Sequence, residues 1–252
     1  RDRSVSRGLG DVYKRQAYLS EIKPVFYYQF QTPKVTAAAG IFTRDMMHDD
    51  DYSTAFFSES ERFFHNRMNG VLAQYNGKRN SYVEFVCDWE GMYSTLSREK
   101  FRILLAGRHY LDTFYYGFNY SMFHYAGQQG APIENVVDLQ LLNPCVGVRF
   151  NAFFDFDIKL GALLTAQRDR SFGHSWEKPC MGEFAFRISR WGLSLDERLY
   201  VGDNIHPFFY GHELEDGTPL PYGRELYPAE SFFRTDQKVY SRTALSYCLL
   251  YT

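Results

Sequence analysis

Hydrophobic and polar residues alternate along much of this chain, in segments of about ten residues. The clearest segment is residues 154–166, where apolar side chains at even positions alternate with polar ones at odd positions, Leu163 being the exception. Residues 81–89 and 181–190 alternate in the same way. Successive side chains of a β-strand point to opposite faces, so this pattern predicts strands with one apolar and one polar face. Noisier strands, rich in Val, Ile, Phe, Tyr and Thr, are predicted at residues 25–32, 35–42, 70–75, 100–110, 114–125, 146–150 and 193–200.

The connections between these strands alternate between short and long. The short ones are residues 33–34, 76–80, 111–113, 151–153 and 191–192, and the long ones are residues 43–69, 90–99, 126–134, 167–179 and 201–230. In an up-and-down barrel every second connection lies at the same end, so tight turns gather at one rim and long loops at the other. A Greek-key β-sandwich gives no such regularity. The sequence therefore predicts an all-β, antiparallel, up-and-down transmembrane β-barrel, with roughly 10–12 strands visible in an incomplete fragment. The longest loops are expected to face outside the cell.

The two ends of the chain match translated sequencing-library adapter. Residues 6–16 are what a transposase end sequence encodes, and residues 248–252 are what its reverse complement encodes. We therefore expect residues 1–16 and 248–252 to be non-native and residues 17–247 to be a partial barrel. Without residues 1–16, Lys and Arg fall from 28 to 23 and Asp and Glu from 30 to 28. This mildly acidic balance argues against a nucleic-acid partner, whose footprint is basic.

Aromatic residues are unusually frequent, with 20 Tyr, 23 Phe and 3 Trp among 252 residues. No run of about 20 predominantly apolar residues, the length that a transmembrane helix needs, is present. Aromatic girdles at the two membrane interfaces of a β-barrel would account for many of these rings. For residues 114–125 we favour such a girdle, made of Tyr115, Tyr116, Tyr120, Phe123 and Tyr125, over a stacking surface for sugars.

The alternation assigns side chains to two faces. On the polar face, ten residues are predicted to line the lumen: Glu84, Asp88, Arg102, Arg108, Arg149, Asp155, Asp157, Lys159, Glu183 and Arg187. On the apolar face, seven residues are predicted to contact lipid: Val83, Phe85, Phe156, Ile158, Leu160, Phe184 and Phe186. The lumen set holds as many acids as bases, so we expect cross-strand ion pairs, for example between Asp157 and Arg149, and weak ion selectivity.

No motif of catalysis or cofactor binding is found. The sequence lacks GxSxG, HExxH, phosphate-loop and EF-hand patterns. Asp45, His48 and residues 49–51 crowd one long loop, for which a solvated acidic loop is favoured over a cation site. Cys87, Cys145 and Cys180 are far apart and suggest neither a disulfide framework nor a zinc site. We therefore expect no catalytic residues, no metal, no cofactor and no enzymatic activity.

Several short aromatic motifs resemble those of porin-like outer-membrane β-barrel proteins of Bacteroidota-type Gram-negative bacteria. These motifs are Ile41-Phe42-Thr43-Arg44, Ser58-Glu59-Ser60-Glu61-Arg62-Phe63-Phe64, Gly70-Val71-Leu72-Ala73-Gln74-Tyr75, Phe85-Val86-Cys87-Asp88-Trp89, Tyr116-Gly117-Phe118-Asn119-Tyr120, Phe123-His124-Tyr125-Ala126-Gly127 and Tyr200-Val201-Gly202-Asp203. The resemblance spans most of residues 25–234 and implies a barrel in the cell outer membrane. It carries over no catalytic residue.

Taken with the alternation, this resemblance leads us to expect a porin-like channel for passive uptake, whose partners are outer-membrane lipid and small solutes or oligosaccharides. The first alternative is a secreted or periplasmic β-sandwich that binds or cleaves glycans. The second is an occluded outer-membrane barrel that serves surface assembly or adhesion.

Overall fold

A computed structural model describes residues 24–131, 136–171, 173, 175–213, 216–217, 219–220 and 222–248. The residues that we expect to be non-native, 1–16 and 248–252, lie outside this described part of the chain, except for Cys248. Within the described part of the chain, no helix combines the length and apolar character needed to cross a membrane.

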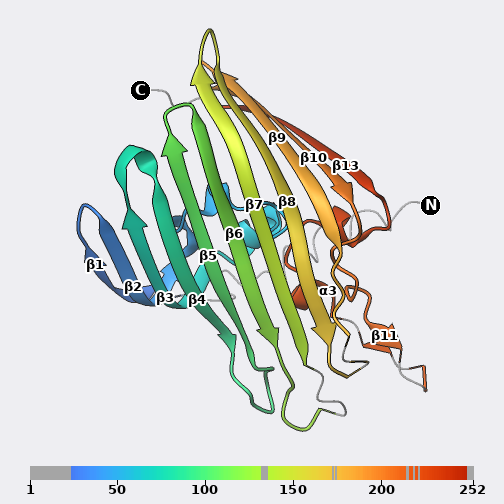
Figure 1. The fold of residues 1–252 in the computed structure, drawn as a ribbon. Coiled ribbons are helices and arrows are strands. Elements are labelled where there is room, and N and C mark those ends of the chain that lie inside the picture. The colour runs from blue at the N-terminus through green and yellow to red at the C-terminus, as the bar shows by residue number, and fades with distance from the viewer. Residues whose placement is uncertain are drawn as a thin grey trace, which may run out of the picture.

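One antiparallel sheet of 11 strands forms the body of the molecule (Figure 1). Its strands are β1 Phe26–Gln31, β2 Val35–Thr43, β3 Arg67–Asn76, β4 Tyr82–Gly91, β5 Lys100–Leu111, β6 Phe114–Tyr125, β7 Val137–Asn151, β8 Asp155–Asp169, β9 Cys180–Arg190, β10 Leu193–Gly202 and β13 Val239–Tyr247. The short elements are η1 Arg44–Met46, η2 Asp49–Asp51, α2 Glu59–Phe64, η3 Lys78–Asn80, β11 His212–Glu213, β12 Pro219–Leu220, α3 Gly223–Leu226 and η4 Ser231–Arg234.

Strand order confirms the predicted all-β, up-and-down arrangement. From β1 to β10 each strand pairs with its neighbour in the sequence, and β10 then pairs with β13. The remaining strands, β11 and β12, form a separate two-stranded sheet. A β-sandwich, which consists of two packed sheets, is therefore wrong as the fold of the described residues.

All ten predicted strands of the main sheet are present, and two details differ. β7 begins at Val137 instead of residue 146, because apolar residues such as Leu141 and Leu142 lie on both of its faces and interrupt the alternation. β13 was not predicted, because Ser241 and Thr243 interrupt its apolar face. In both places a local departure from the alternating pattern prevented a strand from being predicted, at the start of β7 and over all of β13.

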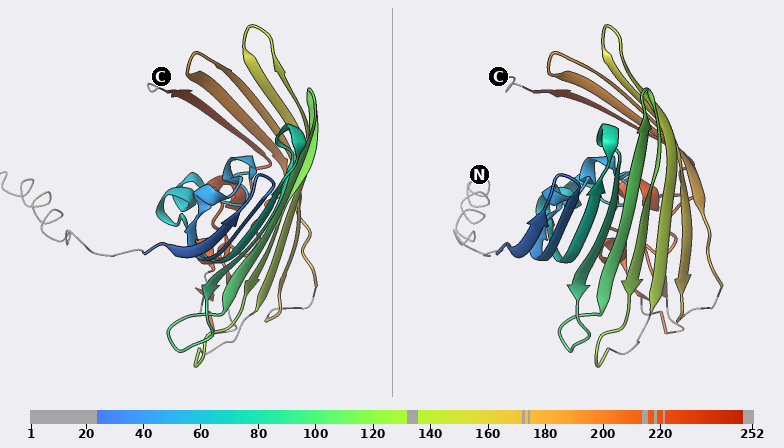
Figure 2. Two further views of the ribbon diagram at one scale, coloured as in Figure 1. Left: turned by 90° about the vertical axis from the view of Figure 1, so that its left-hand side faces the viewer. Right: turned by 60° about the vertical axis from the view of Figure 1, so that its left-hand side comes forward.

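The sheet is strongly curved but not closed into a barrel (Figure 2). β1 and β13 form its two edges, and all six residues of β1 are exposed. The fold class is therefore an open, antiparallel, curved sheet, with a concave and a convex face.

Two long connections fold back over the concave face instead of extending from the rim (Figure 2). We call residues 44–66, which contain α2, the first inner connection, and the described residues of 203–238, which contain α3, the second inner connection. That they face outside the cell stays a prediction. They carry bulky aromatic residues, among them Phe57 and Phe233, whose side chains are fully buried in the concave core. Burial of that apolar surface favours packing over exposure.

Candidate functional site: the charged concave face

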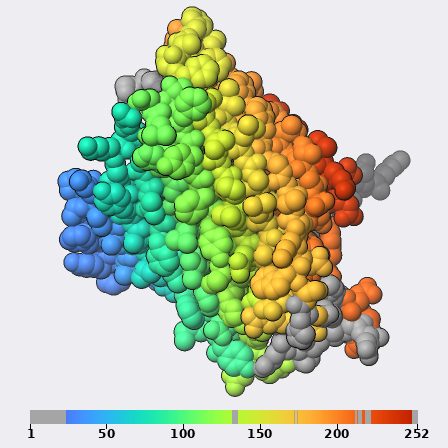
Figure 3. Space-filling view, in the orientation of Figure 1, coloured from blue at the N-terminus to red at the C-terminus, as the bar shows by residue number. Residues whose placement is uncertain are grey.

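Side chains of the sheet alternate between the two faces, with a register shift between Trp89 and Gly91 at the end of β4. In β4, Glu84 and Asp88 are buried against the inner connections, whereas Val83 is 55% exposed on the other side. Residues paired across neighbouring strands lie on the same face, so the register extends this assignment over the sheet. Figure 3 shows the convex face, with the strands side by side.

The register puts all ten predicted lumen residues on the concave face. Five of them are buried: Glu84, Asp88, Arg102, Arg108 and Glu183. Lys159 and Asp157 are half-buried, whereas Arg149, Asp155 and Arg187 are exposed. The exposed three lie nearer the tight turns, beyond the inner connections.

The register also puts all seven predicted lipid-facing residues on the convex face. Leu160 is 57% exposed there, and Phe85, Phe156, Ile158, Phe184 and Phe186 are half-buried among their neighbours. From β2 to β13, every exposed large hydrophobic residue within a strand lies on this face. An exposed apolar surface of this extent marks an interaction site.

The predicted girdle of residues 114–125 is wrong for three of its five residues. Tyr116 and Tyr120 lie on the convex face, but Tyr115, Phe123 and Tyr125 are buried on the concave face. Alternate residues of one strand cannot share a face, and the buried three pack toward the inner connections or bond to wall residues. Much of the aromatic content therefore fills the concave side.

Charges of the wall are mostly paired with nearby charges. Arg149 and Asp157 form the expected cross-strand pair, with a closest N–O distance of 2.6 Å, and Tyr115 donates to the same carboxylate at 2.7 Å. Lys159 pairs with Glu183 at 3.2 Å. Further pairs involve residues that the sequence did not single out, among them Glu90 with Arg102 and Asp196 with Arg187.

Glu84 ties the first inner connection to the wall. Its buried carboxylate accepts hydrogen bonds from the His48 backbone N–H at 2.9 Å and from the Tyr52 hydroxyl at 3.1 Å, both in the connection. The side-chain amide of Gln74 donates at 2.6 Å from the neighbouring strand. The ring of His48 also stacks on Tyr82, with 3.7 Å between ring centroids.

The acidic loop is less solvated than predicted. Asp51 pairs with Arg108 of the wall at 2.6 Å and accepts a hydrogen bond from Tyr82, while Asp49 lies 3.1 Å from Arg62. Among the described residues, no group of three His, Cys, Asp or Glu side chains is placed to hold a metal ion. Asp51 therefore anchors the connection to the wall, and Asp49 holds it to α2.

The second inner connection is held by hydrogen bonds to two residues of β8. Gln167 donates to the Ile205 carbonyl at 2.6 Å and accepts from the Tyr227 hydroxyl at 2.5 Å, and Tyr222 donates to Asp169. His206 is almost fully buried and stacks on the ring of Tyr227. Burial, followed by the charge of Arg234, lowers the pKa of His206 to about 3.

The two connections also contact each other and form one inner layer. The Ser58 N–H donates to the Pro228 carbonyl at 2.9 Å, and the Glu230 N–H donates to the Thr54 carbonyl at 3.2 Å. Tyr200 of β10 lies beneath them, with its hydroxyl 3.3 Å from Ser53 and 3.2 Å from Glu183. Neither the joint layer nor the contacts of Tyr200 with it were predicted from the sequence.

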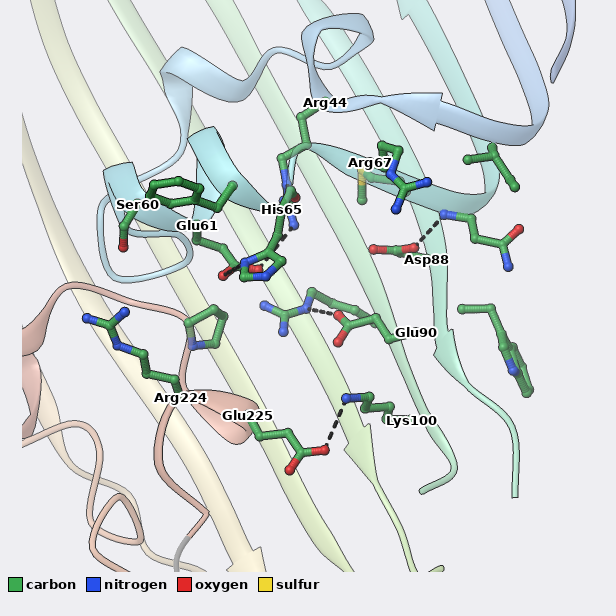
Figure 4. A pocket seen from close by; sticks show the side chains of 17 residues that line it. Arg44, Ser60, Glu61, His65, Arg67, Asp88, Glu90, Lys100, Arg224 and Glu225 are labelled. Carbon is green, nitrogen blue, oxygen red and sulfur yellow. Dashed lines mark hydrogen bonds and ion pairs between the residues drawn. The ribbon is translucent and has the colours of Figure 1, made fainter. Parts of the chain in front are cut away.

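A cavity of about 600 Å³ lies between the inner layer and the long-loop end of the wall (Figure 4). Its lining includes Arg44, Glu61, Asp88 and Arg102, together with residues of α3. Burial, followed by the nearby Arg102, lowers the pKa of Arg44, whose Nη1 is buried without a hydrogen-bond partner. Its guanidinium also lies 4.0 Å from the centroid of the Phe57 ring.

A second cavity of about 270 Å³ has a different set of charges. Its basic residues, all from the wall, are Arg108, Arg149, Lys159, Arg187 and Arg198, and its acidic residues on the concave side are Asp50, Asp51, Asp157 and Asp196. Unlike the first cavity, it includes no residue of the second inner connection. The concave face thus offers two separate polar spaces, with the inner layer contributing to the lining of each.

Comparisons with family models, with curated proteins and with solved structures each found no match for this chain.

Proposed function

We propose that this chain is a wall segment of an outer-membrane β-barrel that acts as a porin-like channel for small solutes, narrowed by its two inner connections. The observation that carries the proposal is the separation of the two faces. The convex face exposes a broad apolar surface, whereas the concave face holds paired charges and two polar cavities. A lipid-facing exterior around a polar interior is the arrangement of transmembrane β-barrels.

A second candidate, the occluded barrel for surface assembly or adhesion, is favoured by the inner layer itself. Hydrogen bonds tie both connections to the wall and to each other across the concave face. In the channel proposal these connections narrow the pore, whereas in the alternative they close it. Conductance distinguishes the two candidates.

Membrane insertion is tested by moving a positive charge from one face to the other. Leu160→Arg places the charge on the convex face, where a position near the bilayer midplane typically costs about 2–4 kcal/mol. The control is Ala244→Arg, on the concave face of β13 directly opposite Asp196. We expect Leu160→Arg to prevent assembly into outer membranes and Ala244→Arg to assemble normally. Equal assembly of both variants would contradict a lipid-facing convex surface.

Channel activity is tested in planar bilayers containing the full-length protein. We expect conductance with weak ion selectivity, because the wall charges are paired locally. A protein that inserts but never conducts would overturn the channel and favour the occluded barrel.

A further inference from the structure

Arg44 carries a hydrogen-bond donor that no described residue satisfies. Its side chain is only 5% exposed and lines the cavity of about 600 Å³ (Figure 4). The Nε atom donates to the His65 carbonyl at 3.1 Å, and Nη2 lies 4.0 Å from Glu61, beyond hydrogen-bond distance. Nη1 is buried without a partner. Buried polar atoms of this kind are rare in folded proteins. This donor therefore points to an acceptor that the described chain does not supply.

A second buried guanidinium, from the wall, lines the same cavity. The side chain of Arg102 is 6% exposed, and its Nε donates to Glu90 at 3.1 Å. Its two terminal nitrogens make no hydrogen bond to any described residue. Arg44 and Arg102 also border one ring, with their guanidinium carbons 4.0 and 5.3 Å from the centroid of Phe57. The cavity is therefore lined by two like charges that keep unused donors.

Charges in the lining restrict what these two guanidinium groups can bind. Five bases and four acids contribute to it: Arg44, Arg67, Lys100, Arg102 and Arg224, with Glu61, Asp88, Glu90 and Glu225. The four carboxylates repel an anion that carries several charges, whereas a single carboxylate matches the excess of one base. Arginine binds carboxylate through charge-assisted, often bidentate hydrogen bonds. The lining therefore favours a ligand with one carboxylate.

Asp88 adds an acceptor to the same cavity. One of its carboxylate oxygens accepts from the Asn69 N–H at 2.8 Å, and the other makes no hydrogen bond with a described residue. The charge of Asp88 is attracted to both Arg44 and Arg102, so it does not require a cation from the ligand. A hydroxyl group can donate to the second oxygen. The cavity therefore suits a ligand that combines a carboxylate with hydroxyl groups.

Aromatic rings and the size of the cavity suit a small sugar ring. Phe64 of α2 and Trp89 of β4 line the cavity and are exposed, so they offer apolar surface to the C–H groups of a sugar. The volume of about 600 Å³ lies within the range of about 300–1,000 Å³ that is typical of small-molecule sites. The cavity also lies at the long-loop end of the wall, which is one of the two mouths of the proposed channel.

We propose that this cavity binds a sugar acid, a small sugar that carries one carboxylate, and that sugar acids are a solute class of the channel. Arg44 and Arg102 hold the carboxylate, after a small rotation of the Arg44 side chain that brings Nη1 to it. Asp88 accepts a hydrogen bond from a sugar hydroxyl. Transport of the bound sugar acid rests on the proposed channel function, whereas binding itself does not.

The first test measures binding of D-glucuronate to the full-length protein in mild detergent by isothermal titration calorimetry. We expect saturable binding, and about ten- to hundredfold weaker binding of D-glucuronamide, which has nearly the same shape without the charge. Acetate and inorganic phosphate, which lack the sugar hydroxyls, and L-alanine, which adds an ammonium group, should bind at least about tenfold more weakly than glucuronate. Equal affinity for any of these four compounds, or no binding of glucuronate, would overturn the proposal.

The second test assigns the carboxylate to its two arginines. Arg44→Gln and Arg102→Gln should each weaken glucuronate binding about ten- to hundredfold and leave glucuronamide binding nearly unchanged, because the amide makes no charged contact. The readout is the ratio of the two affinities, since a loss of folded protein lowers the stoichiometry and not this ratio. The matched control is Arg198→Gln, which removes a wall arginine of the second cavity and should change neither affinity. A wild-type ratio in Arg44→Gln and Arg102→Gln, or the same change in Arg198→Gln, would contradict the assignment.

Failure of the site and failure of the channel give different results. A protein that conducts in planar bilayers but does not bind glucuronate overturns the site and leaves the channel standing. A protein that binds glucuronate but never conducts overturns the channel and leaves the binding site standing.

Discussion

The tether at Glu84 allows the role of the first inner connection to be tested by a single substitution. Glu84→Ala removes the acceptor for the His48 N–H and for the Tyr52 hydroxyl. Two hydrogen bonds to a charged group are worth about 3–6 kcal/mol together. Part of this free energy is regained, because the variant has no carboxylate that must lose its water when the connection docks. We therefore expect the attachment of the connection to weaken by roughly 2 kcal/mol. The pair between Asp51 and Arg108 remains and keeps the release partial.

Limited proteolysis of the detergent-solubilised protein measures this release. Trypsin can cut after Arg62, which in the folded protein contacts Asp49 and the Tyr52 carbonyl. When reclosing is fast, cleavage follows the population of the released connection, which a loss of about 2 kcal/mol raises about 30-fold. In planar bilayers, the same variant should show larger or noisier conductance.

The matched control for this experiment is Asp196→Ala. Asp196 is also an acid of the concave wall, but its contact is with Arg187 of the neighbouring strand at 3.7 Å. We expect cleavage after Arg62 to stay at the wild-type rate in this variant. If Glu84→Ala is cut no faster than Asp196→Ala, the hydrogen bonds to Glu84 do not hold the connection.

Two further outcomes are expected. Gly117→Val should impair folding, because a Cβ at this position would lie 2.4 Å from the Gly107 carbonyl oxygen. Gly182→Val should assemble, because its Cβ would lie 3.7 Å from the nearest atom. Urea titration of both variants checks this difference. Acidification should release the second inner connection, because the pKa of His206 is about 3 when the connection is docked and near 6.5 when it is released. The free energy of docking is therefore fully favourable above about pH 6.5 and weakens as the pH falls toward 3. At pH 5 the loss is about 2 kcal/mol. Proteolysis of residues 203–238 at pH 7.5 and pH 5 measures this, and a His206→Phe variant that keeps the same pH dependence would contradict it.

The strands and their faces could be predicted from the sequence because they follow from local rules. Alternation in residues 81–89 is enough to separate Glu84 from Val83, and pairing with sequence neighbours extends the assignment to the whole sheet. Tight turns support the same register, as at Trp191, which takes a positive φ of 52° immediately before Gly192. None of this requires knowledge of residues distant in the sequence.

The inner layer could not be predicted in this way, because its position depends on contacts between residues far apart in the chain. Ser53 meets Tyr200 across 147 positions, and no periodicity within either segment encodes that contact. One local signal was available. Residues 52–57 and 231–233 combine Phe or Tyr with Ser, Thr and Ala, a composition that is more apolar than a solvated loop requires. Attributing the aromatic content in general to membrane girdles left the role of these rings in the concave core unconsidered.

Under the proposed function, the balance between conduction and closure depends on the inner connections more than on the charges of the wall. A wall whose charges are paired, as in Arg149 with Asp157, presents no strong field of one sign to a passing ion. Several of the contacts that hold the connections are hydrogen bonds and ion pairs to the wall, such as those of Glu84 and Arg108. When these polar groups separate, water takes the place of each lost partner, so the net cost is about 1.5–3 kcal/mol for a hydrogen bond to a charged group and about 1 kcal/mol for a neutral one. An attachment that combines buried aromatic rings with replaceable polar contacts is suited to partial displacement, which is what a channel narrowed by its own connections requires.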